Sequence, residues 1–330
     1  MLTVLSENKK WKIAVVIPCY KVTKHIAKVI RAIGPEIESI YVVDDFCPEN
    51  SGKYVSENSI DSRVKLIFHN KNEGVGGAVI TGYREAFKHG ADIVVKIDGD
   101  GQMDASLIPF FIAPIMRGDA DYTKGNRFFD LSQINNMPTI RIFGNALLSF
   151  ASKFSTGYWN IFDPTNGYTA IHSSVAKYLP LDKISKRYFF ESDILFRLNC
   201  LRAVVMDIPI SASYGDESSN LKVQKIFAEF LYKHIRNFIK RIFYNYYLRD
   251  LSIGSFQLPV GILMLIYGTV IGVSTWRHAI DTNLQTPTGT IMLSVLPIII
   301  GINLLLAFVN YDISTTPTHV MHRQLFNNKY

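Results

Sequence analysis

The chain has 330 residues, enough for one large domain with additional segments or for two modest domains. Hydrophobic residues make up 48% of it, and the mean hydropathy of +0.12 is high for a fully soluble protein. The formal net charge of +7 favours an anionic partner, whether nucleic acid, a phospholipid surface or a phosphorylated substrate. The three cysteines, Cys19, Cys47 and Cys200, stand singly, which excludes a dense disulfide framework and a Cys-x-x-Cys metal site and favours reduced thiols.

From residue 12 to about 100, short apolar runs alternate with amphipathic segments. The predicted strands span residues 12–20, 39–45, 64–70 and 91–101, and the predicted helices span 25–32, 50–58 and the part of 71–90 that follows a glycine-rich turn. The first run has no small-residue cleavage site and is interpreted as a strand, not as a signal peptide. Uniformly apolar strands between helices are typical of a parallel sheet covered on both faces. We therefore predict a doubly wound α/β domain whose ligands bind at the carboxyl ends of the strands.

The fourth predicted strand runs into the stretch VVKIDGDGQMD, in which Asp98 and Asp100 are separated by one glycine. Two carboxylates this close repel each other, so the pair needs positive charge. A tight turn with two carboxylates suits a hard divalent cation that keeps positions for water and substrate phosphates, and Gln102 can add a neutral oxygen. The alternative is a polar turn that caps the next helix.

Two further clusters follow predicted strands. Tyr20 ends the first strand, and Asp44 and Asp45 end the second, where their carboxylates suit ribose hydroxyls or the edge of a base. A solvated acidic turn is the alternative. The turn NEGVGGA, residues 72–78, opens a helix whose N-terminus favours an anion, although an ordinary tight turn fits equally well. Neither G-x-G-x-x-G nor a P-loop occurs.

The middle of the chain, about 105–215, is less regular. The stretches KGNRF and RIFGN supply Arg127 and Arg141, whose side chains suit bidentate contact with a phosphate. Asp163, Glu191 and Asp193 lie among aromatic and apolar residues, so they are acid/base or structural candidates. For Glu191, capping a helix or pairing with a cation remains as good an interpretation as a catalytic role.

The C-terminal third predicts a membrane protein. Residues 216–252 form a basic amphipathic segment suited to an anionic membrane face, with a helix packed on its own domain as the alternative. Residues 254–276 and 288–309 contain no charge and are each long enough to cross a bilayer, which makes two buried core helices the less favoured interpretation. The basic segment precedes the first span, so the positive-inside rule places the catalytic domain and the tail in the cytoplasm.

We accordingly expect four segments. They are a catalytic domain (1–215), basic interface helices (216–252), two transmembrane helices with a short extracytoplasmic loop (253–310) and a cytoplasmic tail (311–330).

The ordered set of motifs VVIPCY, VVDD, NEGVGGA, DGDGQ, GNR, RIFGN, PTNGY and FFESDIL, followed by two spans, resembles the family 2 glycosyltransferases of the GT-A fold. Within that family it looks like the polyprenyl-phosphate glycosyltransferases, the group that includes dolichol-phosphate mannose synthase and the bactoprenyl-phosphate glucosyltransferases. The resemblance covers essentially the whole chain. It departs from the family at Lys21 and Val22, where Asn-Glu is usual, after VVDD, where Phe46 and Cys47 replace Gly-Ser, and at Asn145, where serine is frequent. The Gly-x-Ser-Lys usual near residue 215 is also absent, with Asn220 and only then Lys222.

The resemblance implies a role for each matched residue. It implies that the nucleotide sugar is bound by Pro18, Tyr20, Asp44, Asp45, Asn72, Gly74, Glu191 and Asp193. It implies that Mg²⁺ or Mn²⁺ is held by Asp98, Asp100 and Gln102, and that the lipid phosphate is received by Arg127, Arg141 and Asn145. Asp98, Asp100, Arg127 and Arg141 are then the residues expected to be essential.

The implied reaction is an inverting transfer of a hexose from a UDP- or GDP-linked sugar to undecaprenyl or dolichyl phosphate. The alternative is a transferase acting on a lipid-linked saccharide or another hydroxyl acceptor, which needs a general base such as Glu191 or Asp193. A processive polysaccharide synthase is disfavoured because Q-x-x-R-W is absent. A non-catalytic membrane scaffold is disfavoured by the intact Asp98–Asp100 pair and the two arginines. The basic residues lie beside the spans, so the expected partner is the lipid bilayer and not nucleic acid, and self-association is left open.

Overall fold

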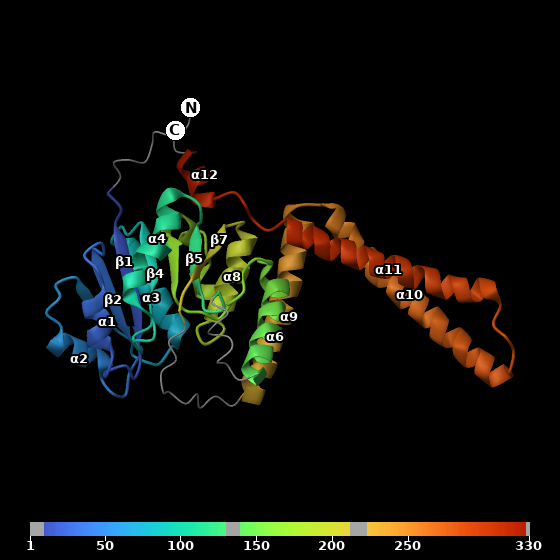
Figure 1. Cartoon of the computed structure of the whole chain (residues 1–330), viewed down its shortest axis with the longest axis horizontal. Helices are drawn as coiled ribbons and strands as arrows, with labels where there is room; N and C mark the ends of the chain where they lie inside the picture. Colours follow the sequence, from blue (N-terminus) through green and yellow to red (C-terminus); the bar gives the residue numbers. More distant parts are fainter. Residues whose placement is uncertain (1–9, 130–138, 212–222, 328–330) are drawn as a thin grey trace. The chain divides into compact units, whose positions relative to one another are not determined.

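A computed structural model describes residues 10–129, 139–211 and 223–327 (Figure 1), apart from the side chains of 139–143, 145, 223–227 and 326–327. The chain forms two compact units. Unit 1 consists of Met1–Phe238 together with Pro317–Tyr330, and unit 2 is Ile239–Thr316. The chain therefore leaves the first unit, forms the second, and returns to the first.

Unit 1 is built on a seven-stranded sheet with the order β3-β2-β1-β4-β6-β5-β7. The strands are β1 (Ile13–Cys19), β2 (Ser39–Asp44), β3 (Val64–Phe68), β4 (Ile93–Lys96), β5 (Tyr122–Asn126), β6 (Thr169–His172) and β7 (Val205–Pro209). Strands β3, β2, β1 and β4 are mutually parallel, as the sequence predicts. Strand β6 runs antiparallel to both of its neighbours, β4 and β5, so the sheet is mixed with a parallel core.

Helices cover both faces of this sheet (Figure 1). They are α1 (Ile26–Ala32), α2 (Ser51–Asn58), α3 (Val75–Lys88), α4 (Ile108–Arg117), α7 (Ser173–Ala176) and α8 (Phe190–Cys200), with 3₁₀ turns at Ala105–Leu107 and Leu181–Lys183. Helix α6 (Thr139–Thr156) packs on α8. Alternate residues of β1 enter different cores: Val15 and Ile17 pack with α1 and α4, and Ala14 and Val16 pack with α3 and α8. A strand buried on both sides must be apolar throughout, which explains its uninterrupted hydrophobic run.

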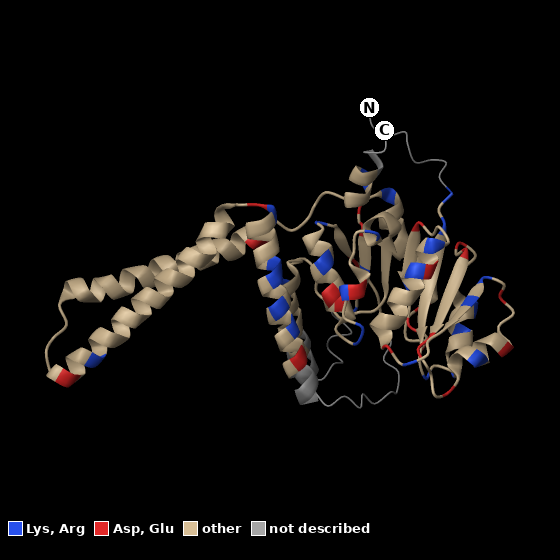
Figure 2. Ribbon diagram, turned by 180° about the vertical axis from the view of Figure 1, so that it is seen from behind, with Lys and Arg blue, Asp and Glu red and all other residues tan. Residues whose placement is uncertain are grey.

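Unit 2 contains two long helices, α10 (Ile253–Thr282) and α11 (Thr288–Ser314), which follow the π-helical segment Tyr244–Arg249. Both are long and apolar enough to cross a membrane, with mean hydropathies of 1.9 and 2.5. In the most apolar 18-residue stretch of each helix, only 11% (α10) and 17% (α11) is buried. A core helix of a soluble protein is mostly buried. Charged residues lie only near the ends of α10 and α11 but recur along α9 (Val223–Phe243), as Figure 2 shows.

Small residues and one ion pair hold unit 2 together. A Cβ atom at Gly261 would lie 3.1 Å from the carbonyl oxygen of Gly301, so the two helices approach closely there. The hydroxyl of Ser294 donates to the Gly268 carbonyl at 2.8 Å. The buried guanidinium of Arg241 contacts both carboxylate oxygens of Asp312, at 2.7 and 2.9 Å.

The tail packs on unit 1. The carboxylate of Asp121, just before β5, accepts hydrogen bonds from the amides of Met321 and His322 at 2.8 Å and lies 2.8 Å from Nδ1 of His322. The His322 ring stacks on His172 with centroids 4.3 Å apart. Residues 321–327 form helix α12 (Met321–Asn327), and α11 continues to Ser314, beyond the predicted start of the tail.

Candidate active site

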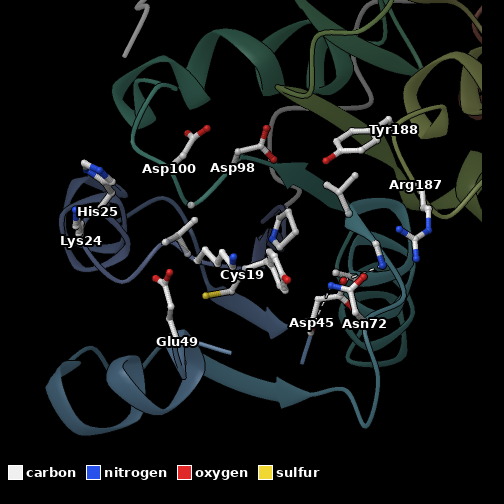
Figure 3. Close-up of a pocket in the computed structure, with 18 residues that line it drawn as sticks. Cys19, Lys24, His25, Asp45, Glu49, Asn72, Asp98, Asp100, Arg187 and Tyr188 are labelled. Atoms are coloured by element: carbon white, nitrogen blue, oxygen red, sulfur yellow. Dashed lines mark hydrogen bonds between the residues drawn. The ribbon is translucent and has the colours of Figure 1, made fainter. Parts of the chain in front are cut away.

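A pocket of about 830 Å³ opens at the carboxyl ends of β1, β2 and β4 (Figure 3). Its lining includes seven of the residues expected to bind the nucleotide sugar or a metal, namely Pro18, Tyr20, Asp45, Asn72, Gly74, Asp98 and Asp100. It also includes cations that the sequence did not single out for this site: Lys21, Lys24 and Arg187. The topology thus brings together residues from five separate loops.

Asp98 faces a buried cation. The ammonium of Lys96, which is 1% exposed, lies 2.9 Å from Oδ1 of Asp98 and 3.4 Å from Oε1 of Glu191. Burial lowers the pKa of Lys96, but the negative charges of Asp98 and Glu191 outweigh burial and hold that pKa above its ordinary value. Burial raises the pKa of Glu191, and the charge of Lys96 opposes this. Glu191 is therefore a partner of Lys96 and does not line the pocket.

Asp98 and Asp100 fit a divalent cation. Both carboxylates line the pocket, and Oδ1 of Asp100 accepts a hydrogen bond from the amide of Gln102 at 3.0 Å. No group of three or more His, Cys, Asp or Glu side chains suited to a metal occurs within the described ranges. Two carboxylates suffice for Mg²⁺ or Mn²⁺ when substrate phosphates and water supply the remaining ligands. Gln102 itself is exposed and lines a neighbouring cavity instead of this pocket.

Asp44 and Asp45 are buried, 4% and 3% exposed, so the solvated acidic turn does not form. The oxygens of Asp44 accept hydrogen bonds from the amides of Cys47 at 2.7 Å and Gly52 at 2.6 Å, which fixes the start of α2. Asp45 accepts the amides of Glu73 and Gly74, both at 2.8 Å. Asp45 lines the pocket while also holding the glycine-rich turn, whereas Asp44 does not line the pocket.

The glycine-rich turn permits close approach of the chain's own backbone. Gly74 has φ +87°, and a Cβ atom there would lie 2.6 Å from the carbonyl oxygen of Lys186. At Gly76 a Cβ atom would lie 2.6 Å from the carbonyl oxygen of Ser185. The amide of Gly77 donates to the Lys186 carbonyl at 3.0 Å, so this protein oxygen satisfies part of the N-terminus of α3. The segment Ser185–Tyr188 is thereby held against the turn, and its Arg187 and Tyr188 form one wall of the pocket, a placement that the sequence motifs did not reveal.

Of the two arginines predicted to bind the acceptor, the structure describes the side chain of Arg127 only. Arg127 forms a bidentate pair with Asp163, with Nε 2.7 Å from Oδ2 and Nη2 3.0 Å from Oδ1. Burial raises the pKa of Asp163, but Arg127 and the charge of Lys124 outweigh it, so the pKa of Asp163 lies below its ordinary value. Asp163 thus orients Arg127, which is 35% exposed and does not line the pocket. The side chains of Arg141 and Asn145, on α6, lie outside the described residues.

Asp193 does not line the pocket either. Its Oδ2 accepts the amide of Ser185 at 2.8 Å, and its Oδ1 accepts Nδ2 of Asn237 at 2.9 Å. Both oxygens therefore hold neighbouring segments of the fold, which leaves Asp193 a structural contact beneath the pocket wall.

Residues 14–179 match the model of the glycosyl transferase family 2. The chain belongs to this family. It is similar to the UDP-N-acetylglucosamine–dolichyl-phosphate N-acetylglucosaminyltransferase of Methanococcus voltae, with 31% identity over 62% of this chain and 87% of the relative. It is also similar to the undecaprenyl-phosphate mannosyltransferase of Micrococcus luteus, with 28% identity over 61% of this chain and 83% of the relative. The dolichol-phosphate mannosyltransferase of Pyrococcus furiosus is 27% identical over 69% of this chain and 64% of its own length.

The fold matches solved glycosyltransferase structures. Mannosyl-3-phosphoglycerate synthase from Rubrobacter xylanophilus superposes with a TM-score of 0.55 at 15% identity, covering 73% of this chain and 77% of that one. Glucosyl-3-phosphoglycerate synthase from Mycobacterium tuberculosis, crystallised with Mn²⁺ and UDP-glucose, gives a TM-score of 0.52 at 16% identity, covering 70% and 79%. The predicted GT-A fold and the assignment as a glycosyltransferase are confirmed.

Proposed function

We propose that this enzyme transfers a hexose, with inversion, from a UDP- or GDP-linked sugar to polyprenyl phosphate. The observation that carries the proposal is the pocket in which Asp98 and Asp100 meet Tyr20, Asp45 and Asn72, because it offers carboxylates for a metal beside space for a nucleotide. The acceptor is inferred from relatives named for dolichyl, undecaprenyl and dolichol phosphates, and from the two helices able to cross a membrane.

The proposed reaction needs stabilisation of the negative charge on the leaving group more than it needs a general base. A polyprenyl phosphate is already anionic near pH 7, so its oxygen can attack the anomeric carbon without losing a proton to the enzyme. Mg²⁺ or Mn²⁺ bound by Asp98 and Asp100 would supply positive charge to the departing nucleoside diphosphate. Arg127, oriented by Asp163, is suited to receive the acceptor phosphate, together with the predicted contacts of Arg141 and Asn145.

A hydroxyl acceptor is the second candidate, and it would require a general base. Glu191 is buried against Lys96, and the oxygens of Asp193 accept hydrogen bonds from Ser185 and Asn237. Neither side chain lines the pocket, which favours the phosphate acceptor. The discriminating experiment offers the membrane-embedded enzyme polyprenyl phosphate and the corresponding polyprenol. We expect a glycolipid only from the phosphate, and equal glycosylation of the alcohol would overturn the proposal.

We further propose that the catalytic domain and the tail both face the cytoplasm. Unit 2 begins and ends at unit 1, since Phe238 precedes it and Pro317 follows it, so two spans return the chain to the side from which it left. Lys233, Arg236 and Lys240 on α9 precede the first span, as the positive-inside rule requires. This topology is checked with a single cysteine introduced into the 283–287 loop, whose labelling is measured from each side of sealed vesicles. Labelling of that loop from the cytoplasmic side would contradict it.

A further inference from the structure

Arg187 is a cation in the pocket wall that no motif of the sequence singles out. Its side chain is exposed to the pocket and lies near Asn72 and Asp45 (Figure 3). Within the described part of the chain, its guanidinium makes no hydrogen bond or ion pair. Other arginines of unit 1 behave differently: Arg84 pairs with Asp182 and Arg197 with Asp193.

A nucleotide diphosphate in this pocket would need positive charge, and the cations that line it are Lys21, Lys24 and Arg187. Four carboxylates line it, those of Asp45, Glu49, Asp98 and Asp100. The anion-binding end of α3 is partly occupied, because the amide of Gly77 already donates to the Lys186 carbonyl. A planar guanidinium that points into such a pocket matches the oxygens of a phosphate better than any neutral neighbour does.

The wall that carries Arg187 is fixed from both sides. On one side, the backbone of Lys186 packs against Gly74, and the Lys186 ammonium lies 2.5 Å from Oε2 of Glu73. On the other side, Asp193 accepts the amide of Ser185, and Asp193 in turn accepts Nδ2 of Asn237 on α9. Asn237 and Asp193 are each 5% exposed, so these hydrogen bonds are shielded from water.

Other residues of α9 contact the same wall. The ammonium of Lys233 lies 3.3 Å from Oγ of Ser185 and 5.5 Å from the ring centroid of Phe189. The rings of His234 and Phe189 meet edge to face at 4.9 Å. The basic helix expected to meet the lipid surface is thus in direct contact with the segment that bears Arg187.

We propose that Arg187 binds the phosphate groups of the nucleotide sugar and that Asn237, acting through Asp193, positions it. This proposal rests on the proposed function, since it assumes a nucleotide sugar in this pocket. Arg187 is a binding residue in this account. Asn237 touches no substrate and is a positioning residue.

The first test measures binding of UDP and of GDP, each with Mn²⁺, to the full-length protein in detergent. For the nucleotide that the wild type binds, we expect Arg187→Gln to raise the Kd about 10-fold, the loss typical of one charge-assisted contact, and Arg187→Lys to raise it less. Arg84→Gln, an arginine outside the pocket, should change it less than twofold. In transfer assays the KM for the nucleotide sugar should rise while that for polyprenyl phosphate stays within twofold.

Several outcomes would overturn the assignment. An Arg187→Gln protein that binds UDP or GDP within twofold of wild type removes Arg187 from the donor site. An equal loss of affinity for the nucleoside without phosphates shows that Arg187 contacts the base or ribose instead. A wild-type protein that binds nucleotide but does not glycosylate polyprenyl phosphate would refute the proposed acceptor and leave the Arg187 comparison valid. A wild type that binds neither nucleotide would refute both proposals.

The positioning role has its own readout. We expect Asn237→Ala to raise the same Kd, and the double variant Arg187→Gln/Asn237→Ala to bind no more weakly than Arg187→Gln alone. Additive losses would show that Asn237 does not act through Arg187. Ser155→Ala, which removes the 2.7 Å contact between α6 and His234, is the matched control on another contact of α9 and should leave the Kd unchanged. If Asn237→Ala does not fold, Asn237→Ser replaces it in the same comparison of single and double variants, and the same two outcomes decide.

Discussion

The buried ammonium of Lys96 lies 2.9 Å from a carboxylate oxygen of Asp98, at the point where β4 ends and the pocket begins. This contact supplies part of the positive charge that is needed because the carboxylates of Asp98 and Asp100 repel each other. Lys96 offsets the charge of Asp98 from inside the sheet, while Asp98 and Asp100 line the pocket. The contact thereby fixes the carboxylate of Asp98 within the fold itself.

Replacement of either pocket carboxylate should abolish transfer. For Asp98→Asn and Asp100→Asn we expect kcat to fall at least about 100-fold, because each change removes a charged ligand of the proposed metal. Asp100→Asn should change the thermal unfolding midpoint little, whereas Asp98→Asn also removes a partner of the buried Lys96 and should lower that midpoint. The measurement is transfer rate against Mn²⁺ concentration. Full activity of the wild type in the presence of EDTA would show that no divalent metal is needed.

Lys96 should matter for stability. Lys96→Met leaves the buried Glu191 without its cation, which should lower the free energy of unfolding by about 3 kcal/mol or more. Adding Glu191→Gln removes the unpaired charge, and the double variant Lys96→Met/Glu191→Gln should recover much of the loss. Chemical denaturation of the three proteins in detergent checks this. A double variant less stable than Lys96→Met alone would mean that Glu191 is held by something other than Lys96.

Arg127 should affect the acceptor and not the donor. Arg127→Ala should raise the KM for polyprenyl phosphate at least about 10-fold with the KM for the nucleotide sugar nearly unchanged, since a bidentate phosphate contact is lost. Asp163→Asn should cause a smaller change in the same direction, because it loosens the pair that orients Arg127. Steady-state kinetics with each substrate varied in turn provide the measurement, and a selective rise in the donor KM would refute the acceptor role.

Asp207, near Lys124 in unit 1, should give stability a recognisable pH dependence. Burial raises the pKa of Asp207 to about 6, and burial lowers the pKa of Lys124 to about 8. A carboxyl whose folded pKa is raised favours the folded state below the unfolded pKa of about 4, and this contribution is lost as pH rises through about 6. Asp207→Asn cannot titrate, so the stability of wild type relative to this variant should fall between pH 4 and 6. The expected fall is at most about 3 kcal/mol. Unfolding midpoints of both proteins at pH 4.5 and 7 test it; a constant difference would show that Asp207 titrates normally.

The sequence predicted the parallel half of the sheet because its signal is local. Strands β1, β2 and β4 are buried on both faces and therefore mostly apolar, and the aspartates that follow β2 and β4 mark one edge of the sheet. The roles of individual aspartates were harder to predict from the sequence. Asp44 and Asp193 look like site residues from their motifs, but the backbone and side-chain donors that occupy their oxygens become visible only in the folded chain.

Long-range contacts explain the remaining differences. Arg187 reaches the pocket because Gly74 and Gly76 admit the backbone of Lys186 and Ser185, more than 100 residues away in sequence. The tail returns to unit 1 because the buried carboxylate of Asp121 receives donors from Met321 and His322. Neither pairing leaves a periodic or compositional pattern, so no reading of hydrophobicity or charge along the chain could have predicted it.

The central claim is transfer of a sugar from a nucleotide to polyprenyl phosphate at the Asp98–Asp100 pocket. Its most direct test incubates membranes containing the full-length protein with radiolabelled UDP- and GDP-sugars, with and without added polyprenyl phosphate. We predict that one nucleotide sugar yields a labelled lipid, that its formation requires the polyprenyl phosphate and Mn²⁺ or Mg²⁺, and that membranes with the Asp98→Asn protein form none. Label that enters lipid to the same extent with the Asp98→Asn protein, or only into a hydroxyl acceptor, would contradict the claim.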